Sequence, residues 1–467
     1  MEDTIAAIST PAGTGAIAMI RLSGRDAREI AGLVFSTPDN GKGVGSFRSG
    51  QVHYGWIRDH ERIIDEVVIT AYQCPKSYTG EDMIEITCHG SVFIQQEILN
   101  LLIRKGARMA QPGEFTQRAY LNGKMDLSQA EAVADLIAAS GQASHRLAMD
   151  QLRGGISNEL DKIRGELLDF VSLIELELDF SGEDVEFVDR SRLKALLDFI
   201  LEHFDQLIRS FELGNAIKSG VPVAITGESN VGKSTLLNAL LKEDKAIVSE
   251  IAGTTRDVIE DTIHIGGIEF RFIDTAGIRE THDAIETLGI ERAYKQIEKA
   301  RIILLMTDAT APTDQSLQWI EKIESHVRED QHLIILLNKA DLNSDAISTM
   351  TEASLKSSLI THHSSLLSIS AKMGAGLDRL EEALLELVNI KALENNDVVI
   401  ANARHYEALV NARTALYRTL NGLHSGTSGD FLAQDIREAM HHLESITGAI
   451  SSDEILGNIF RNFCIGK

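Results

Sequence analysis

The chain has few of the residues that mark disulfide-bonded, zinc-binding or membrane proteins. Only 3 cysteines occur among its 467 residues, Cys74, Cys88 and Cys464, and no two of them form a CxxC pair. This spacing excludes a disulfide framework or a zinc finger and favours a reducing compartment. The apolar runs, such as residues 302–306, are far shorter than the roughly 20 residues that span a bilayer. Because no basic region precedes an apolar stretch near residue 1 either, the sequence predicts a cytoplasmic protein without a membrane partner.

Positive charge is also scarce. The chain carries 45 Lys and Arg against 69 Asp and Glu, which gives a formal net charge of −24. Dividing the chain after residues 120, 216 and 390 leaves each of the segments net negative. No segment therefore offers the basic platform that binding to a polyanion demands, and any role on nucleic acid requires a local patch or a partner.

Hydrophobic periodicity predicts a multidomain chain with α/β and all-α parts. Within residues 1–120, segments with strand-like alternation of apolar and polar residues are followed by a helical pattern around 91–105. This segment therefore predicts an N-terminal α/β domain. Residues 121–216 and 391–467 have apolar residues at helical spacing, whereas 217–390 alternate buried-type strands with helices, as in a parallel sheet. We favour one discontinuous helical domain with an inserted α/β domain; a row of separate domains is the alternative. The strands expected in the first segment are residues 16–22, 51–57, 66–71 and 83–88.

A phosphate-binding loop opens the inserted domain. Residues 227–234 read GESNVGKS between a predicted strand at 221–226 and a predicted helix at 235–241. In this setting successive backbone N–H groups surround the phosphates at a helix N-terminus. Lys233 is expected to reach the β- and γ-phosphates and Ser234 to bind Mg²⁺. The predicted nucleotide contacts here are Asn230, Val231, Gly232, Lys233, Ser234 and Thr235.

The motifs that follow predict a Ras-like GTPase domain. The Thr255 hydroxyl stands where it can close on Mg²⁺, and Asp274 begins a DxxG motif. Asp341 of Asn-Lys-Ala-Asp can accept both N–H donors of a guanine edge, an arrangement that adenine lacks. A hairpin is expected from residues 258–265 and 268–273. The further predicted contacts are Ser249, Glu250, Ile251, Ala252, Gly253, Thr254, Thr255, Asp274, Thr275, Ala276, Gly277, Asn338, Lys339, Asp341, Ser370, Ala371 and Lys372.

The catalytic group differs from that of Ras-type enzymes. Those enzymes place a glutamine after DxxG to orient the attacking water, whereas this chain has Ile278. An apolar side chain cannot do this, so we expect Glu286, in the following loop, to orient water or act as the general base. The alternative is a merely solvated glutamate, since Glu280 and Glu291 lie near it in the sequence.

The whole chain resembles the tRNA-modification GTPase MnmE (TrmE) family. Besides the GTPase motifs, the resemblance rests on residues 4–11 (TIAAISTP), 77–82 (SYTGED), 112–119 (PGEFTQRA), 121–127 (LNGKMDL) and the terminal 463–467 (FCIGK). It implies a homodimer that works with a flavoprotein partner, MnmG (GidA), the flavin belonging to the partner. Together they would add a carboxymethylaminomethyl or aminomethyl group to carbon 5 of the wobble uridine of certain tRNAs, with tRNA bound mainly through the partner.

The resemblance also implies a folate and a potassium ion. The folate, 5-formyltetrahydrofolate or a relative, would bind residues 1–120, and the matching positions are Arg21, Glu85, Lys124 and Lys467. K⁺ would activate the GTPase and promote pairing of the G domains. Its matching positions are Asn230, Ser249, Ile251 and Thr254. Ser249 stands where threonine is expected, and Glu286 falls on the family's catalytic glutamate.

Two other functions remain open from the sequence. One is an Era-like ribosome-assembly or regulatory GTPase, although a basic RNA-binding appendage and a second P-loop are both lacking. The other is a folate-dependent enzyme with a regulatory G domain, a function that overlaps with that of a tRNA-modification GTPase.

Overall fold

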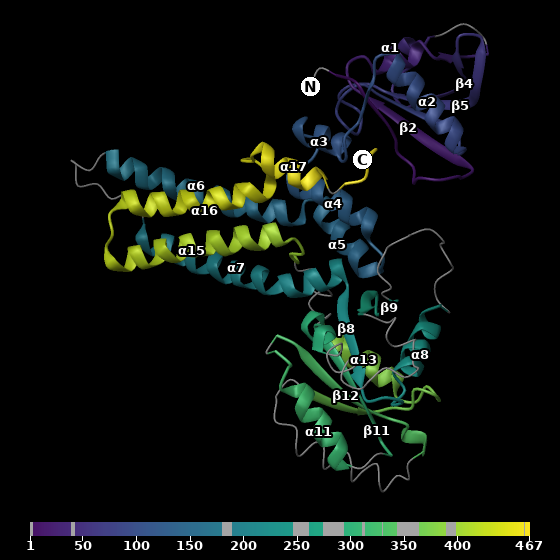
Figure 1. Cartoon of the computed structure of the whole chain (residues 1–467). Helices are drawn as coiled ribbons and strands as arrows, with labels where there is room; N and C mark the ends of the chain where they lie inside the picture. Colours follow the sequence, from purple (N-terminus) through teal and green to yellow (C-terminus); the bar gives the residue numbers. More distant parts are fainter. Residues whose placement is uncertain are drawn as a thin grey trace. The chain divides into compact units, whose positions relative to one another are not determined.

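The computed structural model describes residues 3–38, 43–179, 189–245, 261–273, 294–310, 313–328, 330–342, 364–388, 398–461 and 463–467 (Figure 1). It divides into two compact units. The first unit comprises Met1–Ala138, Ala148–Leu201 and Glu407–Lys467, and the second Ala139–Leu147 and Glu202–Tyr406. Each unit thus combines segments that are distant in the sequence. The four-segment division at residues 120, 216 and 390 stays a prediction.

A mixed seven-stranded sheet forms the N-terminal part of the first unit. Its strand order is β3-β4-β5-β6-β2-β1-β7, and most neighbours are antiparallel. Buried and less buried residues alternate along β2, β5 and β6, which places one face of these strands in the core. The strands are β1 (Ile5–Ile8), β2 (Ile17–Ser23), β3 (Phe35–Ser36), β4 (Gln51–Asp59), β5 (Arg62–Tyr72), β6 (Met83–His89) and β7 (Arg108–Met109).

Two helices supply the other half of this core. Helix α1 (Ala27–Gly32) and helix α2 (Val92–Arg104) contact the sheet through residues that include Ile30, Ile98 and Leu102. The strand residues opposite them, such as Ile20 and Ile86, are fully buried. The strands and the helix that the sequence predicts here agree with the structure within two residues at each end, except that β5 begins four residues before the predicted start.

The helical part of the first unit joins segments from both ends of the chain. Helix α6 packs along α16, where Arg164 Nε donates to Glu444 Oε1 at 2.5 Å (Figure 1). Helix α17 packs on α3, and the Tyr120 hydroxyl donates to the Gly448 carbonyl at 2.6 Å. Helices lying in this part, or entering it, are α3 (Glu114–Leu121), α4 (Leu127–Ala138), α5 (Gln142–Leu152), α6 (Gly155–Asp179), α7 (Arg190–Ser219), α15 (Ala403–Ser425), α16 (Gly429–Thr447) and α17 (Asp453–Arg461).

The second unit contains a six-stranded sheet of order β13-β12-β11-β8-β10-β9. All neighbours are parallel except the β9–β10 hairpin, which turns at Gly266 and Gly267. The elements of this domain are β8 (Val221–Gly227), α8 (Lys233–Lys245), β9 (Asp261–Ile265), β10 (Ile268–Phe272), β11 (Ile302–Asp308), α11 (Thr313–Glu324), β12 (His332–Asn338), β13 (Ser364–Ser368) and α13 (Leu377–Leu387).

The buried runs of β11 and β12 explain why this sheet is parallel. Ile302–Asp308 and His332–Asn338 are almost continuously apolar, and apolar side chains lie in cores on both sides of the sheet. The fold class is therefore confirmed: an N-terminal α/β domain, a helical domain, and an inserted P-loop domain. No helix among the described residues is both long and apolar enough to cross a membrane.

Candidate functional site

The phosphate-binding loop lies between β8 and α8 at the carboxyl edge of the parallel sheet. Gly227 has φ 150° and Gly232 has φ 102°, backbone conformations that side chains disfavour. A Cβ on Gly227 would lie 2.4 Å from the Met306 carbonyl oxygen, and one on Gly232 would lie 2.3 Å from Asn338 Nδ2. Asn230 also has positive φ, 62°. The two glycines therefore allow the loop to pass close to β11 and β12.

Lys233 points back into this loop. Its Nζ donates to the carbonyl oxygens of Gly227 at 2.8 Å and Glu228 at 2.6 Å. Burial lowers the pKa of the Lys233 ammonium, and the charge of Glu228 opposes the change. The ammonium is thus held inside the ring of backbone groups where phosphates bind in P-loop proteins. Ser234 and Thr235 follow in the first turn of α8.

Asn338 joins three of the predicted motifs. Its Nδ2 donates to the Val231 carbonyl at 2.7 Å, and its Oδ1 accepts from the Ala371 N–H at 2.9 Å. The Ser370 hydroxyl donates to Asp341 Oδ1 at 2.6 Å. The P-loop and both base-recognition segments are therefore brought together at one edge of the sheet, which is where open α/β sheets bind ligands. Lys372 is exposed beside them.

Asp308 is a residue of this site that the sequence reasoning missed. At the carboxyl end of β11, its Oδ2 pairs with Lys339 Nζ at 2.5 Å, while its Oδ1 accepts from the Thr310 N–H and hydroxyl at 2.9 and 2.7 Å. Burial acts to raise the pKa of Asp308, but the bonds from Lys339 and Thr310 prevail and lower it. Its place at the end of a strand next to Asn338 was the available signal.

Several predicted residues lie outside the described parts of the chain. These are the switch residues Ser249, Glu250, Ile251, Ala252, Gly253, Thr254 and Thr255, the motif Asp274, Thr275, Ala276 and Gly277, and the candidate catalytic Glu286. Their roles stay predictions. Among the described residues no group of three or more His, Cys, Asp or Glu side chains could hold a metal ion.

A second polar site lies on the sheet of the N-terminal domain. Arg21 and Glu85 are cross-strand partners on β2 and β6, and Arg21 donates to Glu85 Oε1 from Nε at 3.0 Å and from Nη2 at 2.7 Å. The Tyr72 hydroxyl donates to the other oxygen of Glu85 at 3.2 Å. The structure thus brings together the first two residues predicted for folate binding.

Aromatic rings flank the Arg21–Glu85 pair. The Arg21 guanidinium carbon lies 5.4 Å from the ring centroid of Tyr78 and 5.7 Å from that of Phe115. Both rings belong to segments that carry the family resemblance, but the sequence predicted no role for either of them. Phe115 is fully buried, whereas Tyr78 is partly exposed. A partly exposed aromatic ring next to a charged pair suits a flat heteroaromatic ligand with polar edges.

The other two predicted folate residues lie on separate segments. Lys124 Nζ donates to the Pro75 carbonyl at 3.1 Å. Lys467 ends a tail that is fastened to the N-terminal domain, since Ser9 Oγ donates to the Gly466 carbonyl at 3.0 Å and Ile465 bridges Pro112. Within the described structure, no hydrogen bond joins Lys124 or Lys467 to Arg21.

The fold and the first site define a P-loop protein that binds guanine nucleotides. Residues 4–124 match the model of the GTP-binding protein TrmE N-terminus, and residues 127–464 match that of the MnmE helical domain. The tRNA modification GTPase MnmE of Bacteroides thetaiotaomicron is 54% identical over 466 residues, and that of Christiangramia forsetii is 51% identical over 474 residues. Each alignment covers 100% of this chain and 100% of the relative. The chain belongs to the MnmE family of tRNA modification GTPases.

One of the solved structures that match part of the chain is that of Era from Aquifex aeolicus. It is 28% identical with a TM-score of 0.26, and covers 41% of this chain and 65% of its own.

Proposed function

We propose that the chain is a K⁺-activated GTPase that acts, with the flavoprotein MnmG, in modification of the wobble uridine of certain tRNAs. The observation that carries the proposal is the match to the MnmE family along the full chain. The hydrogen bonds of Asn338 to the P-loop and to Ala371, which hold the nucleotide-binding motifs together, support it. The family match favours this function over the Era-like alternative. The modification proposed is a carboxymethylaminomethyl or aminomethyl group at carbon 5.

We propose roles for the main polar residues of the nucleotide site. Lys233 and the P-loop N–H groups would bind the phosphates, and the Ser370-supported Asp341 would accept the guanine N–H donors. The hydroxyl of Ser234 would bind Mg²⁺, which neutralises phosphate charge, together with Thr255 and Asp274. The absence of a Ras-type glutamine leaves the orientation of water to Glu286.

A potassium ion fits the chemistry of the P-loop. Asn230 is exposed at positive φ, so its amide oxygen is available beside the phosphate loop. Hard cations prefer such oxygen donors. We propose that Asn230 and the segment containing Ser249, Ile251 and Thr254 would hold K⁺, which supplies a further positive charge near the phosphates.

The N-terminal domain would bind the folate that provides the one-carbon unit. Glu85 suits the amino-pyrimidine edge of 5-formyltetrahydrofolate, and Arg21, which is paired with Glu85, would lie at the same end of the ligand. Lys124 and Lys467 suit its carboxylates. The partly exposed ring of Tyr78 beside Arg21 supports this proposal.

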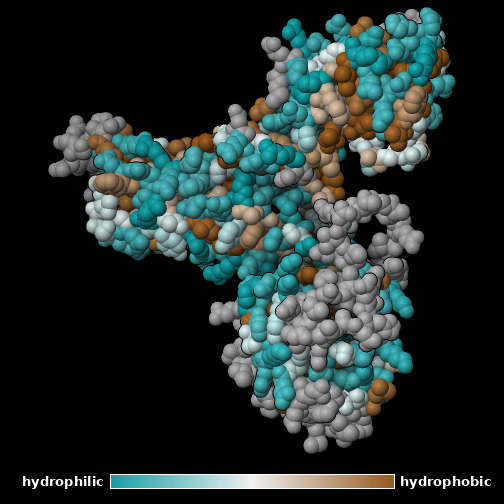
Figure 2. Space-filling view, viewed as in Figure 1, coloured by the Kyte–Doolittle hydropathy of each residue, from teal (hydrophilic) through white to brown (hydrophobic). Residues whose placement is uncertain are grey.

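We also propose that the protein acts as a homodimer through this domain. The open face of the sheet exposes Ile17 and Val52 at 65% each and Tyr54 at 50%, and Tyr54 lies opposite Val68 in the β4–β5 register. Apolar residues appear at the surface of the N-terminal domain in Figure 2. Exposed apolar patches of this kind mark interaction surfaces. Because every segment of the chain is acidic, tRNA would bind mainly through MnmG, whose flavin serves the reaction.

The cation dependence of hydrolysis tests this proposal. We expect faster GTP hydrolysis in KCl than in NaCl at equal ionic strength, because Na⁺ is too small to span the P-loop and switch oxygens. Asn230→Ala should remove the difference while the protein still binds GTP. Equal rates in both salts for the unaltered protein would refute K⁺ activation.

A further inference from the structure

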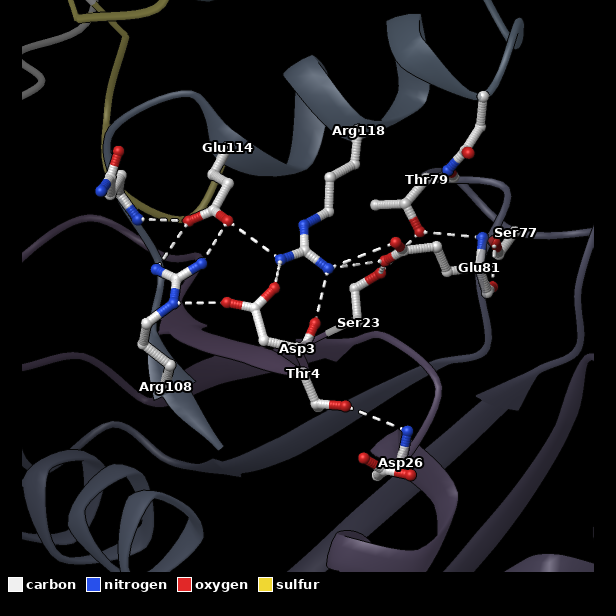
Figure 3. A network of polar contacts seen from close by, with 12 residues as sticks. Asp3, Thr4, Ser23, Asp26, Ser77, Thr79, Glu81, Arg108, Glu114 and Arg118 are labelled. Atoms are coloured by element: carbon white, nitrogen blue, oxygen red, sulfur yellow. Dashed lines mark hydrogen bonds and ion pairs between the residues drawn. The ribbon is translucent and has the colours of Figure 1, made fainter. Parts of the chain in front are cut away.

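One arginine lies at the centre of a buried polar network in the N-terminal part of the first unit (Figure 3). Arg118, on α3, is only 1% exposed, so its charge must be met by protein groups. Its Nη2 donates to Asp3 Oδ1 at 2.8 Å and to Glu114 Oε1 at 3.0 Å. Its Nη1 donates to the Asp3 carbonyl at 2.8 Å and to both Glu81 oxygens at 3.2 Å. Arg118 therefore joins three segments of the chain.

The hydrogen bonds between Arg118 and Glu81 fix the loop formed by residues 77–82. Glu81 Oε2 also accepts from the Ser23 hydroxyl at 2.7 Å, and the Ser77 hydroxyl donates to the Glu81 carbonyl at 2.6 Å. Ser23 and Thr79 share a further hydrogen bond of 2.6 Å between their hydroxyls. The same loop carries Tyr78, whose ring lies beside Arg21. The loop is thus held from inside by one charged contact and several hydroxyl contacts.

Helix α3 contacts each part of the proposed folate site. Phe115 lies beside Arg21, and the Thr116 and Tyr78 hydroxyls are 2.8 Å apart. At its N-terminus the Gly113 N–H donates to the Cys464 carbonyl of the C-terminal tail at 3.3 Å. Just after the helix, Asn122 Nδ2 donates to the Thr79 carbonyl at 2.7 Å. A rigid link between this helix and the 77–82 loop therefore sets the spacing of the aromatic and cationic groups.

A neighbouring arginine provides an internal comparison. Arg108 donates to Asp3 Oδ2 at 2.7 Å and to Glu114 at 2.6 and 3.1 Å, so it shares two of the three carboxylates. Among the hydrogen bonds of the described residues, however, Glu81 receives a guanidinium from Arg118 alone. The two arginines thus differ in whether they reach the 77–82 loop.

We propose that Arg118 is a positioning residue for the folate site, which locks the 77–82 loop onto α3 and so places Tyr78 and Phe115 around Arg21. The inference rests on the proposed binding of folate by this domain. Arg118 is too buried to touch the ligand itself, so it acts through Glu81.

Binding of 5-formyltetrahydrofolate to the full-length protein, measured by titration calorimetry, tests the inference. Arg118→Gln should raise Kd by about tenfold or more, the scale of a lost charge-assisted hydrogen bond. Arg108→Gln removes an equal charge from two of the same carboxylates and should leave Kd within about twofold of the unaltered protein, because the side-chain bonds of Arg108 to Asp3 and Glu114 do not reach the 77–82 loop. Rates of GTP hydrolysis should stay unchanged in both variants, because the nucleotide site lies in the second unit. An unchanged circular dichroism spectrum should report that the N-terminal domain of each variant is folded.

Glu81→Gln provides a second route if Arg118→Gln does not fold. It keeps the size and the Ser23 contact but weakens the link to Arg118, so Kd should again rise. The double variant should bind no more weakly than Arg118→Gln alone, because both changes break one link. Equal effects of Arg118→Gln and Arg108→Gln on Kd, or additive effects in the double variant, would overturn the positioning role. Absence of folate binding to the unaltered protein would instead refute the proposed folate site, and the inference with it.

Discussion

At the scale of single residues, the chemistry of hydrolysis turns on Ile278 and Glu286. Ile278 follows the Asp-Thr-Ala-Gly motif and cannot polarise water. Both residues lie outside the described parts of the chain, so the role of Glu286 is inferred from the sequence and the family. A carboxylate that orients the attacking water should affect the rate of GTP hydrolysis much more than the affinity for GTP.

Glu286→Ala is therefore expected to depress kcat for GTP hydrolysis by at least about 10²-fold, the lower range for a positioned acid–base group. Its affinity for GTP should stay nearly unchanged. Steady-state hydrolysis and nucleotide titration measure the two quantities separately. Glu280→Ala and Glu291→Ala are the matched controls and should behave as the unaltered protein. Normal hydrolysis by Glu286→Ala, or loss of GTP binding, would contradict the assignment.

Asp308 allows a second prediction at this scale. Because it pairs with Lys339 of the guanine motif rather than with a phosphate-binding residue, Asp308→Asn should weaken GTP and GDP binding alike. We expect about a tenfold rise in both dissociation constants, since one charged hydrogen bond is lost. Asp378→Asn, in the exposed first turn of α13, serves as the control. A variant that loses GTP affinity but keeps GDP affinity would show that Asp308 acts on the γ-phosphate side instead.

The sequence predicted the residues whose chemistry is carried by a motif, and it missed those that act through contacts. Lys233, Asn338 and Asp341 are recognisable because phosphate and guanine impose residue types at fixed spacing. Asp308 and Arg118 have no such pattern, since their partners lie on other strands and segments and become neighbours only in the fold.

At the scale of elements, two glycines within helices differ in whether the structure leaves room for a side chain. The comparison shows how packing can outweigh the low helix propensity of glycine. Gly214, in α7, lies against residue 400, and a Cβ there would be 2.1 Å from the Ile400 carbonyl oxygen. The Ile400 N–H also donates to Ser210 Oγ at 3.1 Å, which holds this segment on the helix. At Gly165, in α6, a Cβ would meet no atom of the described structure within 4 Å beyond the backbone of its own helix.

Replacing each of these two glycines by alanine should therefore change the free energy of unfolding in opposite directions. Gly165→Ala should raise the free energy of unfolding by about 0.5–1 kcal/mol, because alanine is the better helix former. Gly214→Ala should lower it by about 1–3 kcal/mol, the usual cost of overpacking. Chemical denaturation of the full-length protein measures both. Stabilisation by Gly214→Ala would mean that the segment at residue 400 is not packed as described.

The types of the elements were predictable, but their ends were less so. Strand β5 extends from Arg62 to Tyr72, well beyond the predicted 66–71, because pairing with β4 continues past a bulge at Ile57 and Arg58. Hydrophobic alternation indicates where a strand is buried, whereas its exposed ends depend on a neighbour that the sequence does not identify.

At the scale of the whole molecule, the insertion of the P-loop domain into the helical domain was predictable from periodicity. Helical patterns on both sides of an α/β pattern predict two halves that must bury their apolar faces together, and α6 with α16 does so. The division into two compact units was not predictable, since helices α7 and α15 each contribute residues to both.

The central claim, that this chain acts in wobble-uridine modification, is tested most directly by reconstitution. The full-length protein would be combined with MnmG and its flavin, GTP, Mg²⁺, K⁺, 5-formyltetrahydrofolate, an amine donor and a tRNA that lacks the modification. Mass spectrometry of the digested tRNA should then show the carboxymethylaminomethyl or aminomethyl group on the wobble uridine. The group should be absent with Glu286→Ala. An unmodified uridine despite active GTP hydrolysis, in a mixture where another MnmE family member gives the product, would contradict the account.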